Sequence, residues 1–340
     1  MEEPCKDRTL RGSRDGFVET VVFNTALIRR RIRSPKLCME MLTAGQSTLT
    51  DIVLCYMEDR VDQICLKRLK KRIDEISVDS LTMNQESLAE LLLPGRWFNP
   101  FPRFHLTERP DTAAASVLEG NIVILVDNSP SAILLPTTLF AITEEANDYY
   151  FPPITGTYLR LSRFLIMVIS LVLTPFFLLL MQNPGWIPES FQFIRIQDTV
   201  NIPLIWQFLL LELAVDGLRL AAIHTPDMLS TPLSVIAGLV FGEFAVNSGW
   251  FNSEVMLYRA FVTIANYSQS NAELNYAVKF MRILLLLLTC WFGSTGFIAG
   301  LAITFVSLLG CRTFSGKGYL YPLIPFHWKT LRRQLFRMKL

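Results

Sequence analysis

Three ionisable residues lie close together in an otherwise apolar stretch of the chain. Glu212, Asp216 and Arg219 fall within Ile202–Ile223, IPLIWQFLLLELAVDGLRLAAI, which is long enough to cross a bilayer as one helix. Spacings of four and three residues place them on one stripe of a helix, with the acids ahead of the base. Because ionisable groups are costly at membrane depth, we expect them to face the protein interior or a water-filled path. Two interpretations stay open: a buried ion-paired cluster that locks helices together, or part of an ion path.

The next apolar segment combines two glycines with a single acid. Leu233–Val246, LSVIAGLVFGEFAV, carries Gly238, Gly242 and Glu243. Small residues four apart allow another helix to approach closely. A carboxylate beside such a glycine face could line a pore, so this segment is a candidate ion path.

Two further ionisable residues, Glu254 and Arg259, fall in the segment Glu254–Tyr267 at membrane or interfacial depth. This segment and Leu233–Val246 are each 14 residues long, which is short for a crossing. We therefore expect both to be re-entrant or shielded by protein. The predicted intramembrane polar network consists of Glu212, Asp216, Arg219, Glu254 and Arg259.

Residues that could support catalysis or bind a metal are scattered. No cysteine belongs to a CxxC pair or has a histidine at ligand spacing, so we expect free thiols and no metal site. The chain has no GxxxxGKS/T, GxGxxG or GxSxG motif, hence no usual phosphate-binding loop or nucleophile elbow. We expect no enzymatic activity, no catalytic residues and no cofactor. The cysteines are Cys5, Cys38, Cys55, Cys65, Cys290 and Cys311, and the histidines are His105, His224 and His327.

The elements that hold these residues begin with a first membrane helix. Phe164–Gln182 has 19 residues without a charge, close to the roughly 20 that an α-helix needs to cross a bilayer core. Arg160 and Arg163 precede it. Since Lys and Arg favour the cytoplasmic side, we expect the preceding domain to be cytoplasmic.

Charge divides the chain near residue 150. Residues 1–150 hold 18 Lys and Arg against 22 Asp and Glu, while residues 151–340 hold 14 against 8 and are mostly apolar. We predict a cytoplasmic domain over 1–150, a helical transmembrane domain of about six segments over 151–315, and a basic cytoplasmic tail over 316–340. Residues 1–16 lack the apolar core of a signal peptide, so the first span is expected to direct insertion.

The first 150 residues alternate helical and strand patterns. They predict an α/β domain with an open mixed sheet, ahead of an all-α polytopic membrane domain. The basic run at residues 29–31 is interpreted as a solvated helix end, because this half is net acidic, and no nucleic-acid partner is expected. The predicted helices are Arg14–Ile32, Val61–Ile76 and Gln85–Leu93; the predicted strands are Thr50–Met57, Ser77–Leu81, and a pair, NIVILVD and SAILLP, around a tight turn at 128–130.

A long uncharged run ends the membrane part. Arg282 and Arg312 enclose 29 uncharged residues, too many for one ordinary span, and Gly293–Gly296 interrupts them. We predict a helical hairpin or a broken helix, with Lys279, Arg282 and Arg312 on one side of the membrane. The basic tail HWKTLRRQLFRMKL then places both termini in the cytoplasm, with six crossings in all.

Long strings of the sequence resemble the A-subunit family of bacterial spore germination proteins, of GerA type. They are RGSRDGFVETVVFNTALIRRRIRSP, FHLTERPDTAAASVLEGNIVILVDNSPSAILLPTTL, DYYFPPITGTYLRLSRF, LLLELAVDGLRLAAIHTP and TFSGKGYLYPLIPF, covering roughly residues 11–326. The AIHTP and VDNSPSAILLPTTL stretches resemble the stage V sporulation branch more than the nutrient-receptor branch. Family members usually carry another cytoplasmic subdomain ahead of the RGSRDGF-like string, where this chain has ten residues; we therefore expect a truncated product, an incomplete gene model or a short variant.

The resemblance implies a function in the membrane of the spore. It implies a cytoplasmic domain followed by a helical domain that oligomerises in the spore inner membrane into an ion channel acting in germination. By the same resemblance Leu233–Val246 corresponds to a helix that lines the pore, with Glu243 as a pore-lining acid and the ionisable residues of Ile202–Ile223 as supporting network. The expected partners are the lipid bilayer, copies of this chain and other membrane subunits of a germination complex. The alternatives are a non-conducting structural or signalling subunit and, ranked last, a membrane enzyme or lipid transporter.

Overall fold

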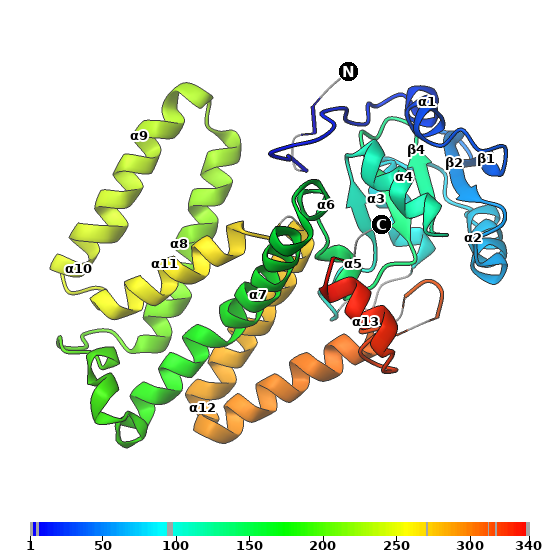
Figure 1. Ribbon diagram of the computed structural model, residues 1–340. Coiled ribbons are helices and arrows are strands. Elements are labelled where there is room, and N and C mark those ends of the chain that lie inside the picture. The colour runs from blue at the N-terminus through cyan, green and yellow to red at the C-terminus, as the bar shows by residue number, and fades with distance from the viewer. Residues whose placement is uncertain are drawn as a thin grey trace. The chain divides into compact units, whose positions relative to one another are not determined.

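Figure 1 shows the computed structural model of the protein. It describes residues 3–4, 7–93, 98–269, 271–311, 313–316 and 318–337, and for residues 227–230, 233–234 and 241 the backbone alone. The chain forms two compact units, Met1–Ser162 with Ser307–Leu340, and Arg163–Val306. The predicted division at residues 150 and 315, which follows the change in charge and apolar composition, stays a prediction.

The first unit is built on a five-stranded sheet in the order β1-β2-β4-β5-β3. All four strand pairs are antiparallel, so the predicted mixed sheet is wrong. Two of the pairs, β1 with β2 and β4 with β5, are antiparallel because short turns join them, whereas a parallel pair needs a long crossover. The strands are β1 (Leu37–Ala44), β2 (Thr50–Met57), β3 (His105–Thr107), β4 (Ile122–Val126) and β5 (Ala132–Leu135).

Several predicted strands are confirmed and one is not. Thr50–Met57 and the β4-β5 hairpin form as predicted, with Asn128 at φ 56° in the tight turn. Ser77–Leu81 is irregular, because its carbonyl groups accept hydrogen bonds from the turn between β1 and β2 and not from a neighbouring strand. The Val78 carbonyl accepts from the Gln46 amide, and the Asp79 carbonyl accepts from the Ser47 amide. The strands β1 and β3 were not predicted.

Helices cover both faces of the sheet. Because strand side chains alternate between faces, Ile52, Leu54 and Ile124 pack against α2 and α3 on one side. Val53, Cys55 and Leu125 pack against α1 and α4 on the other. The first unit is therefore an α/β domain, as predicted, and its helices and sheet form three layers. The helices are α1 (Val21–Arg31), α2 (Gln63–Asp74), α3 (Gln85–Leu92) and α4 (Pro110–Leu118).

The helix predicted over Arg14–Ile32 starts later, at Val21. The residues before it are held in place by other hydrogen bonds: the Phe17 amide donates to the Glu108 carbonyl, and the Asn24 side chain bonds both backbone groups of Val18. Tertiary pairing thus replaces the first helical turns that the apolar stripe predicted.

The C-terminal segment returns to this first unit. The Leu139 amide donates to the Tyr319 carbonyl, and Arg68 donates to the carbonyl of Phe314, which is buried against the sheet. The described residues of the predicted tail, 316–337, therefore belong to the sheet unit. Its remaining helices are α5 (Leu139–Ile142), α6 (Asn147–Tyr150) and α13 (Trp328–Leu335).

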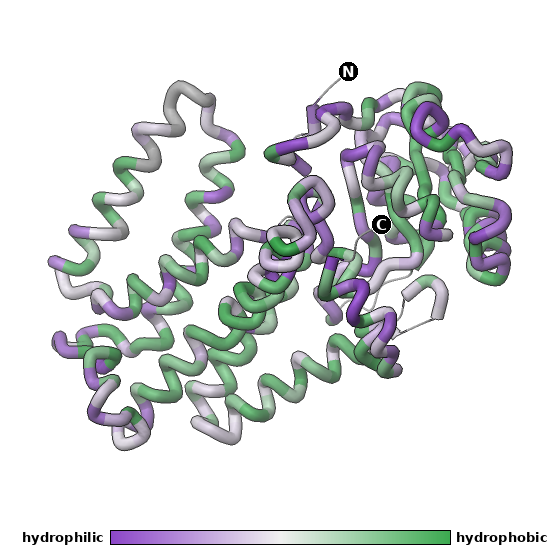
Figure 2. The backbone as a smooth tube through the Cα atoms, in the orientation of Figure 1, coloured by the Kyte–Doolittle hydropathy of each residue, from purple (hydrophilic) through white to green (hydrophobic). Residues whose placement is uncertain are grey.

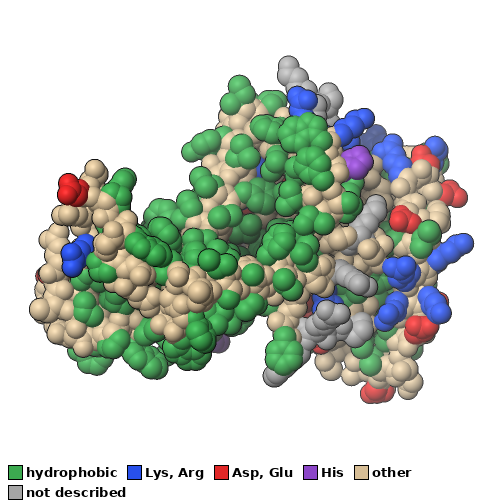
Figure 3. Space-filling model, turned by 90° about the horizontal axis from the view of Figure 1, so that it is seen from below, with side chains coloured by type: hydrophobic (Ala, Val, Ile, Leu, Met, Phe, Trp, Pro, Cys, Tyr) green, Lys and Arg blue, Asp and Glu red, His purple; other side chains and the backbone are tan. Residues whose placement is uncertain are grey.

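The second unit is helical. Two of its helices are long and apolar enough to cross a membrane by length and composition, α7 (Pro153–Gln182) and α12 (Ala272–Gly310). Figure 2 shows hydrophobic residues along most of both. Their outer side chains are exposed, Leu165 and Val168 on α7 and Ile298 and Val306 on α12 among them. Figure 3 shows one face of the protein on which hydrophobic side chains cover a wide area. The number of membrane segments, predicted as six, stays a prediction.

The helix α7 begins within the sheet unit. Arg160, predicted as a flanking charge, is 1 % exposed and pairs with Glu144 at 2.9 Å and with Asp148 at 3.3 Å. This guanidinium is therefore part of a buried cluster of the first unit, and the apolar part of α7 follows it.

The helix α12 breaks where the sequence predicted. Gly293 has φ 59° and ψ −131°, outside the helical region, and the chain reverses there (Figure 1). A Cβ atom at Gly296 would lie 1.9 Å from the Leu288 carbonyl oxygen, and one at Gly300 would lie 2.3 Å from Leu285 Cδ1. The two halves of the hairpin thus touch through a pair of glycines four residues apart.

The other elements of this unit connect and surround the two long helices. They are the 3₁₀ turns η1 (Pro184–Trp186) and η2 (Glu189–Ile194), the helices α8 (Leu204–His224), α9 (Asp227–Gly238), α10 (Ala245–Asn247) and α11 (Ser253–Tyr267), and the π-helical turn η3 (Leu239–Phe244).

Candidate functional site

An apolar layer positions the charged part of α8. Phe208 and Leu211 of α8 pack with Phe177 of α7, Val255 of α11 and Leu286 of α12. The rings of Phe177 and Phe208 meet edge to face with their centroids 6.1 Å apart. Burial of these side chains orients α8 so that the next residue, Glu212, points into the bundle.

The buried carboxylate of Glu212 binds three bases from other helices. Its Oε1 accepts from Arg282 Nε at 2.9 Å and Nη2 at 2.7 Å, and its Oε2 accepts from Arg259 Nη2 at 2.7 Å. Lys279 Nζ lies 3.7 Å from Oε2. Arg282 also donates to the Ser170 carbonyl of α7 at 3.1 Å. One carboxylate therefore links α7, α8, α11 and α12.

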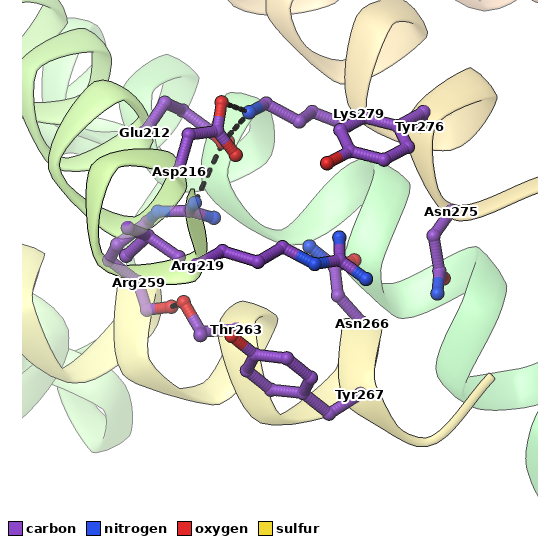
Figure 4. Close-up of a pocket in the computed structure, with 11 residues that line it drawn as sticks. Glu212, Asp216, Arg219, Arg259, Thr263, Asn266, Tyr267, Asn275, Tyr276 and Lys279 are labelled. Carbon is purple, nitrogen blue, oxygen red and sulfur yellow. Dashed lines mark hydrogen bonds and ion pairs between the residues drawn. The ribbon is translucent and has the colours of Figure 1, made fainter. Parts of the chain in front are cut away.

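The other two residues of the predicted stripe lie further along α8. Asp216 pairs with Lys279, and its side chain is 35 % exposed. Arg219 extends away from the acids and lies over the rings of Tyr267 and Tyr276, 5.8 and 5.1 Å from their centroids (Figure 4). Glu212, Asp216 and Arg219 line one small cavity, but Arg219 forms no ion pair with Glu212 or Asp216 among the described contacts.

The sequence predicted that Lys279 and Arg282 lie on one side of the membrane, outside the polar network. In the structure both contact Glu212. Two acids in an apolar helix, α8, require bases at the same depth, and this requirement was the signal that could have found Lys279 and Arg282. Arg259 was predicted in the network and lies in it.

The structure does not bring Glu254 into this cluster. Glu254 lies in the first turn of α11, where it accepts from the Gln197 amide at 3.4 Å and from the Ser253 hydroxyl at 3.3 Å. A carboxylate is stabilised at a helix N-terminus by the unpaired amides and the helix dipole, which explains this position.

The candidate pore segment is longer than the 14 residues that the sequence indicated. Helical structure runs from Asp227 through η3 to Asn247, which is 21 residues or about 31 Å. Gly238 ends α9, and Gly242 and Glu243 fall in the π-helical turn. The segment's number of residues is close to what a crossing needs, but its apolar part among the described residues, Val235–Asn247, is shorter than α7 and α12.

The glycine face of this segment is open. A Cβ atom at Gly238 or Gly242 would meet nothing within 4 Å among the described residues, in contrast to the equally spaced Gly296 and Gly300. Glu243 is exposed, as are the apolar side chains of Val235, Ile236, Leu239, Val240 and Phe244 around it.

Cysteine chemistry has no visible site in the described part of the chain. The five cysteines there form no disulfide, and Cys5 lies outside it, as do Arg312 and Lys339 of the predicted topology. Burial raises the pKa of Cys55 to about 12, which disfavours its reactive thiolate. No group of three or more metal-ligating side chains occurs among the described residues.

The chain is similar in sequence to one protein family and to several known proteins. The family described as Bacillus/Clostridium GerA spore germination protein matches residues 1–340. Stage V sporulation protein AF of Bacillus subtilis (strain 168) is 39% identical over 336 residues, which cover 99% of this chain and 68% of that protein. Spore germination protein KA of the same organism is 30% identical over 341 residues, with 99% and 62% covered. The uncharacterized membrane protein YfkQ, also of Bacillus subtilis, is 29% identical, with 96% and 64% covered.

One solved structure is also similar. The N-terminal domain of the A subunit of the Bacillus megaterium spore germinant receptor GerK3 has 35% sequence identity and a TM-score of 0.29, covering 36% of this chain and 95% of that one. The chain spans about two thirds of the length of the curated relatives it matches. With a family match over its whole length and a relative at 39% identity, the chain belongs to the Bacillus/Clostridium GerA spore germination protein family.

Proposed function

We propose that this chain is a subunit of an oligomeric ion channel that acts in bacterial spore germination, with residues 227–247 lining the pore. Support for the biological process comes from relatives named for sporulation and spore germination. Support for a membrane location comes from a relative named as a membrane protein and from the apolar helices α7 and α12. The proposal gives the chain no catalytic role and places it in the spore inner membrane, with both termini cytoplasmic.

The observation that carries the proposal is the open face of the 227–247 segment. It is long enough to span, its glycines have no neighbour within 4 Å among the described residues, and Glu243 is exposed. Copies of the chain that pack through this glycine face would place one Glu243 carboxylate per subunit around an axis. Such a ring concentrates cations and disfavours anions.

A non-conducting structural or signalling subunit is the second candidate. The observation that favours it is the Glu212 cluster, in which the carboxylate is fully occupied by bases from α11 and α12. A buried carboxylate that is bound by bases from other helices holds those helices together and does not conduct. In this function the sheet unit transmits the state of other germination subunits, which we propose as partners in either case.

Reversal potential separates the two functions. Full-length protein and its Glu243→Gln variant are reconstituted in liposomes at matched protein density and measured under a KCl gradient. We expect cation-selective current from the wild type, and a reversal potential closer to zero for Glu243→Gln, which keeps the shape but loses the charge. Glu243→Lys should oppose cations further.

Glu189→Gln is the matched control, since Glu189 is an exposed acid outside the pore segment. It should leave the reversal potential unchanged. An unchanged reversal potential in a conducting Glu243→Gln variant would remove Glu243 from the filter. Absence of wild-type current at verified protein density would favour the non-conducting function.

A further inference from the structure

A small cavity opens beside the Glu212 cluster, between α8, α11 and α12 (Figure 4). Its volume of about 20 Å³ is enough for one water-sized particle. The wall is mixed: amides, hydroxyls and charges from the three helices lie beside the apolar side chain of Val215 and the rings of Tyr267 and Tyr276. The residues that carry the argument are Glu212, Asp216, Arg219, Arg259, Asn266 and Lys279.

Positive charge is in excess around this cavity. Three bases line it, Arg219, Arg259 and Lys279, against two acids, Glu212 and Asp216. Glu212 is also bound by Arg282, which lies just behind it and is completely buried. The cluster thus combines four cationic side chains with two carboxylates. Unbalanced charge is costly where water is scarce, so the arrangement calls for an anion.

Arg259 supplies a second, independent observation. Its side chain is 4 % exposed, and one nitrogen, Nη2, donates to Glu212. Its Nε and Nη1 are buried and have no hydrogen-bond partner among the described residues. Leaving donors of a buried guanidinium unmatched is unfavourable, because the group has lost its hydrogen bonds to water. An acceptor in the cavity that Arg259 lines would remove this cost.

We propose that this cavity binds a small inorganic anion of the halide class, chloride under cellular conditions. A water molecule would satisfy a donor but leave the charge excess unchanged. A free amino acid or a phosphate is several times larger than the space available. A chloride ion matches the size, needs only donors around it, and finds them in Arg259, Lys279 and the amide of Asn266.

Arg219 marks the mouth of the site. It is held between the rings of Tyr267 and Tyr276, both partly exposed, rather than in an ion pair with the α8 acids. Its charge therefore attracts an entering anion while its removal leaves the Glu212 ion pairs intact. The bound anion would neutralise the cluster and stabilise the contact between α8, α11 and α12. This inference does not depend on conduction through the 227–247 segment.

The test uses the full chain purified in a chloride-free gluconate buffer. Sodium chloride replaces sodium gluconate at constant ionic strength while thermal unfolding is followed, and bound ³⁶Cl⁻ is counted by equilibrium dialysis. We expect a saturable rise in the unfolding temperature and about one chloride per chain. Bromide should act like chloride, and acetate should not, because it exceeds the cavity.

Variants connect the binding to this cavity. Arg219→Gln should weaken chloride binding at least threefold without loss of folding, and Arg259→Lys, which keeps the charge but loses the fork of donors, should weaken it at least tenfold. Arg195→Gln is the control, because Arg195 is exposed and outside the cluster. Glu243→Gln should leave chloride binding unchanged, which keeps this test separate from that of the channel.

Three outcomes would overturn the inference. One is the absence of bound ³⁶Cl⁻, in which case the cavity holds water. Another is equal stabilisation by chloride, acetate and gluconate. The third is an equal effect of Arg219→Gln and Arg195→Gln on chloride affinity.

Discussion

Glu212 of α8 and Arg282 of α12 form a two-point ion pair across 70 residues of sequence, with two of the three guanidinium nitrogens, Nε and Nη2, on one carboxylate oxygen at 2.9 and 2.7 Å. The Arg282 side chain is 0 % exposed and the Glu212 side chain 5 %. The partner expected from helix spacing, Arg219, lies elsewhere. This buried ion pair of the helical unit therefore joins residues that are far apart in the sequence.

Removing the Glu212 charge should destabilise the protein more than removing that of Asp216. Glu212→Gln leaves Arg259 and Arg282 without a buried counter-charge, and breaking such a pair costs about 3–5 kcal/mol. Asp216→Asn affects one partly exposed pair and should cost about 1 kcal/mol or less. Thermal unfolding in detergent and the level of assembled protein measure both. Equal losses for the two variants would show that the cluster is solvated.

The two glycine pairs should respond differently to an added methyl group. Gly296→Ala forces a Cβ atom against the Leu288 carbonyl, and overpacking of this kind costs about 1–3 kcal/mol. Gly238→Ala meets no neighbour within 4 Å among the described residues and should leave the stability of the single chain unchanged or raised by up to about 1 kcal/mol.

Cross-linking tests whether the open face of Gly238 joins copies of the chain. If the face of Gly238 joins copies of the chain, Gly238→Leu should reduce the oligomer fraction in liposomes while the unfolding temperature of the detergent-isolated chain stays constant. An unaffected oligomer would place the interface on another face.

Acid should weaken the sheet unit partly through Asp111. Burial raises the pKa of this carboxyl, but hydrogen bonds from Arg109 at 2.6 and 3.1 Å and from the Tyr150 hydroxyl at 2.6 Å outweigh it and hold the pKa below the ordinary value of 3.8. As the pH falls, the Asp111 carboxylate is therefore protonated at a higher pH in the unfolded chain than in the folded one. The stabilisation is present above the ordinary value and is lost as the pH falls through the folded-state value.

Asp111→Asn should thus cost about 1.5–3 kcal/mol at neutral pH and flatten the loss of stability below about pH 4. The measurement is the free energy of unfolding of the full chain against pH. Asp74→Asn, an exposed acid of α2, is the control. A variant with the same acid profile as the wild type would contradict the assignment.

Topology can be read from cysteine accessibility. Single cysteines at Arg14 and Lys329 in a cysteine-free background should react only after the membrane is permeabilised, because basic residues before α7 and after α12 favour a cytoplasmic location. A cysteine at Glu189, in the connector after α7, should react from outside. Labelling of position 14 or 329 in intact cells would refute the six-crossing arrangement.

The sequence determined those features that depend on neighbouring residues. The apolar run Thr50–Met57 and the hairpin around Asn128 form as predicted, because strand propensity and turn chemistry are local. The break of α12 at Gly293 follows from glycine in an apolar run of excessive length. Charged residues on α8 indicated a buried polar site, because the free-energy cost of placing a charge in an apolar environment does not depend on the fold.

Only the tertiary structure decided which groups meet. Sheet direction follows from the order in which strands add to the sheet, so the antiparallel pairing of β2 with β4 could not be read from either strand. Lys279 and Arg282 reach Glu212, and Glu254 does not, because the packing of α11 and α12 on α8 sets their depth. Two glycine pairs have the same spacing but different surroundings. Gly296 and Gly300 face the first half of α12, whereas Gly238 and Gly242 meet nothing within 4 Å among the described residues, since spacing defines a helix face but not what covers it.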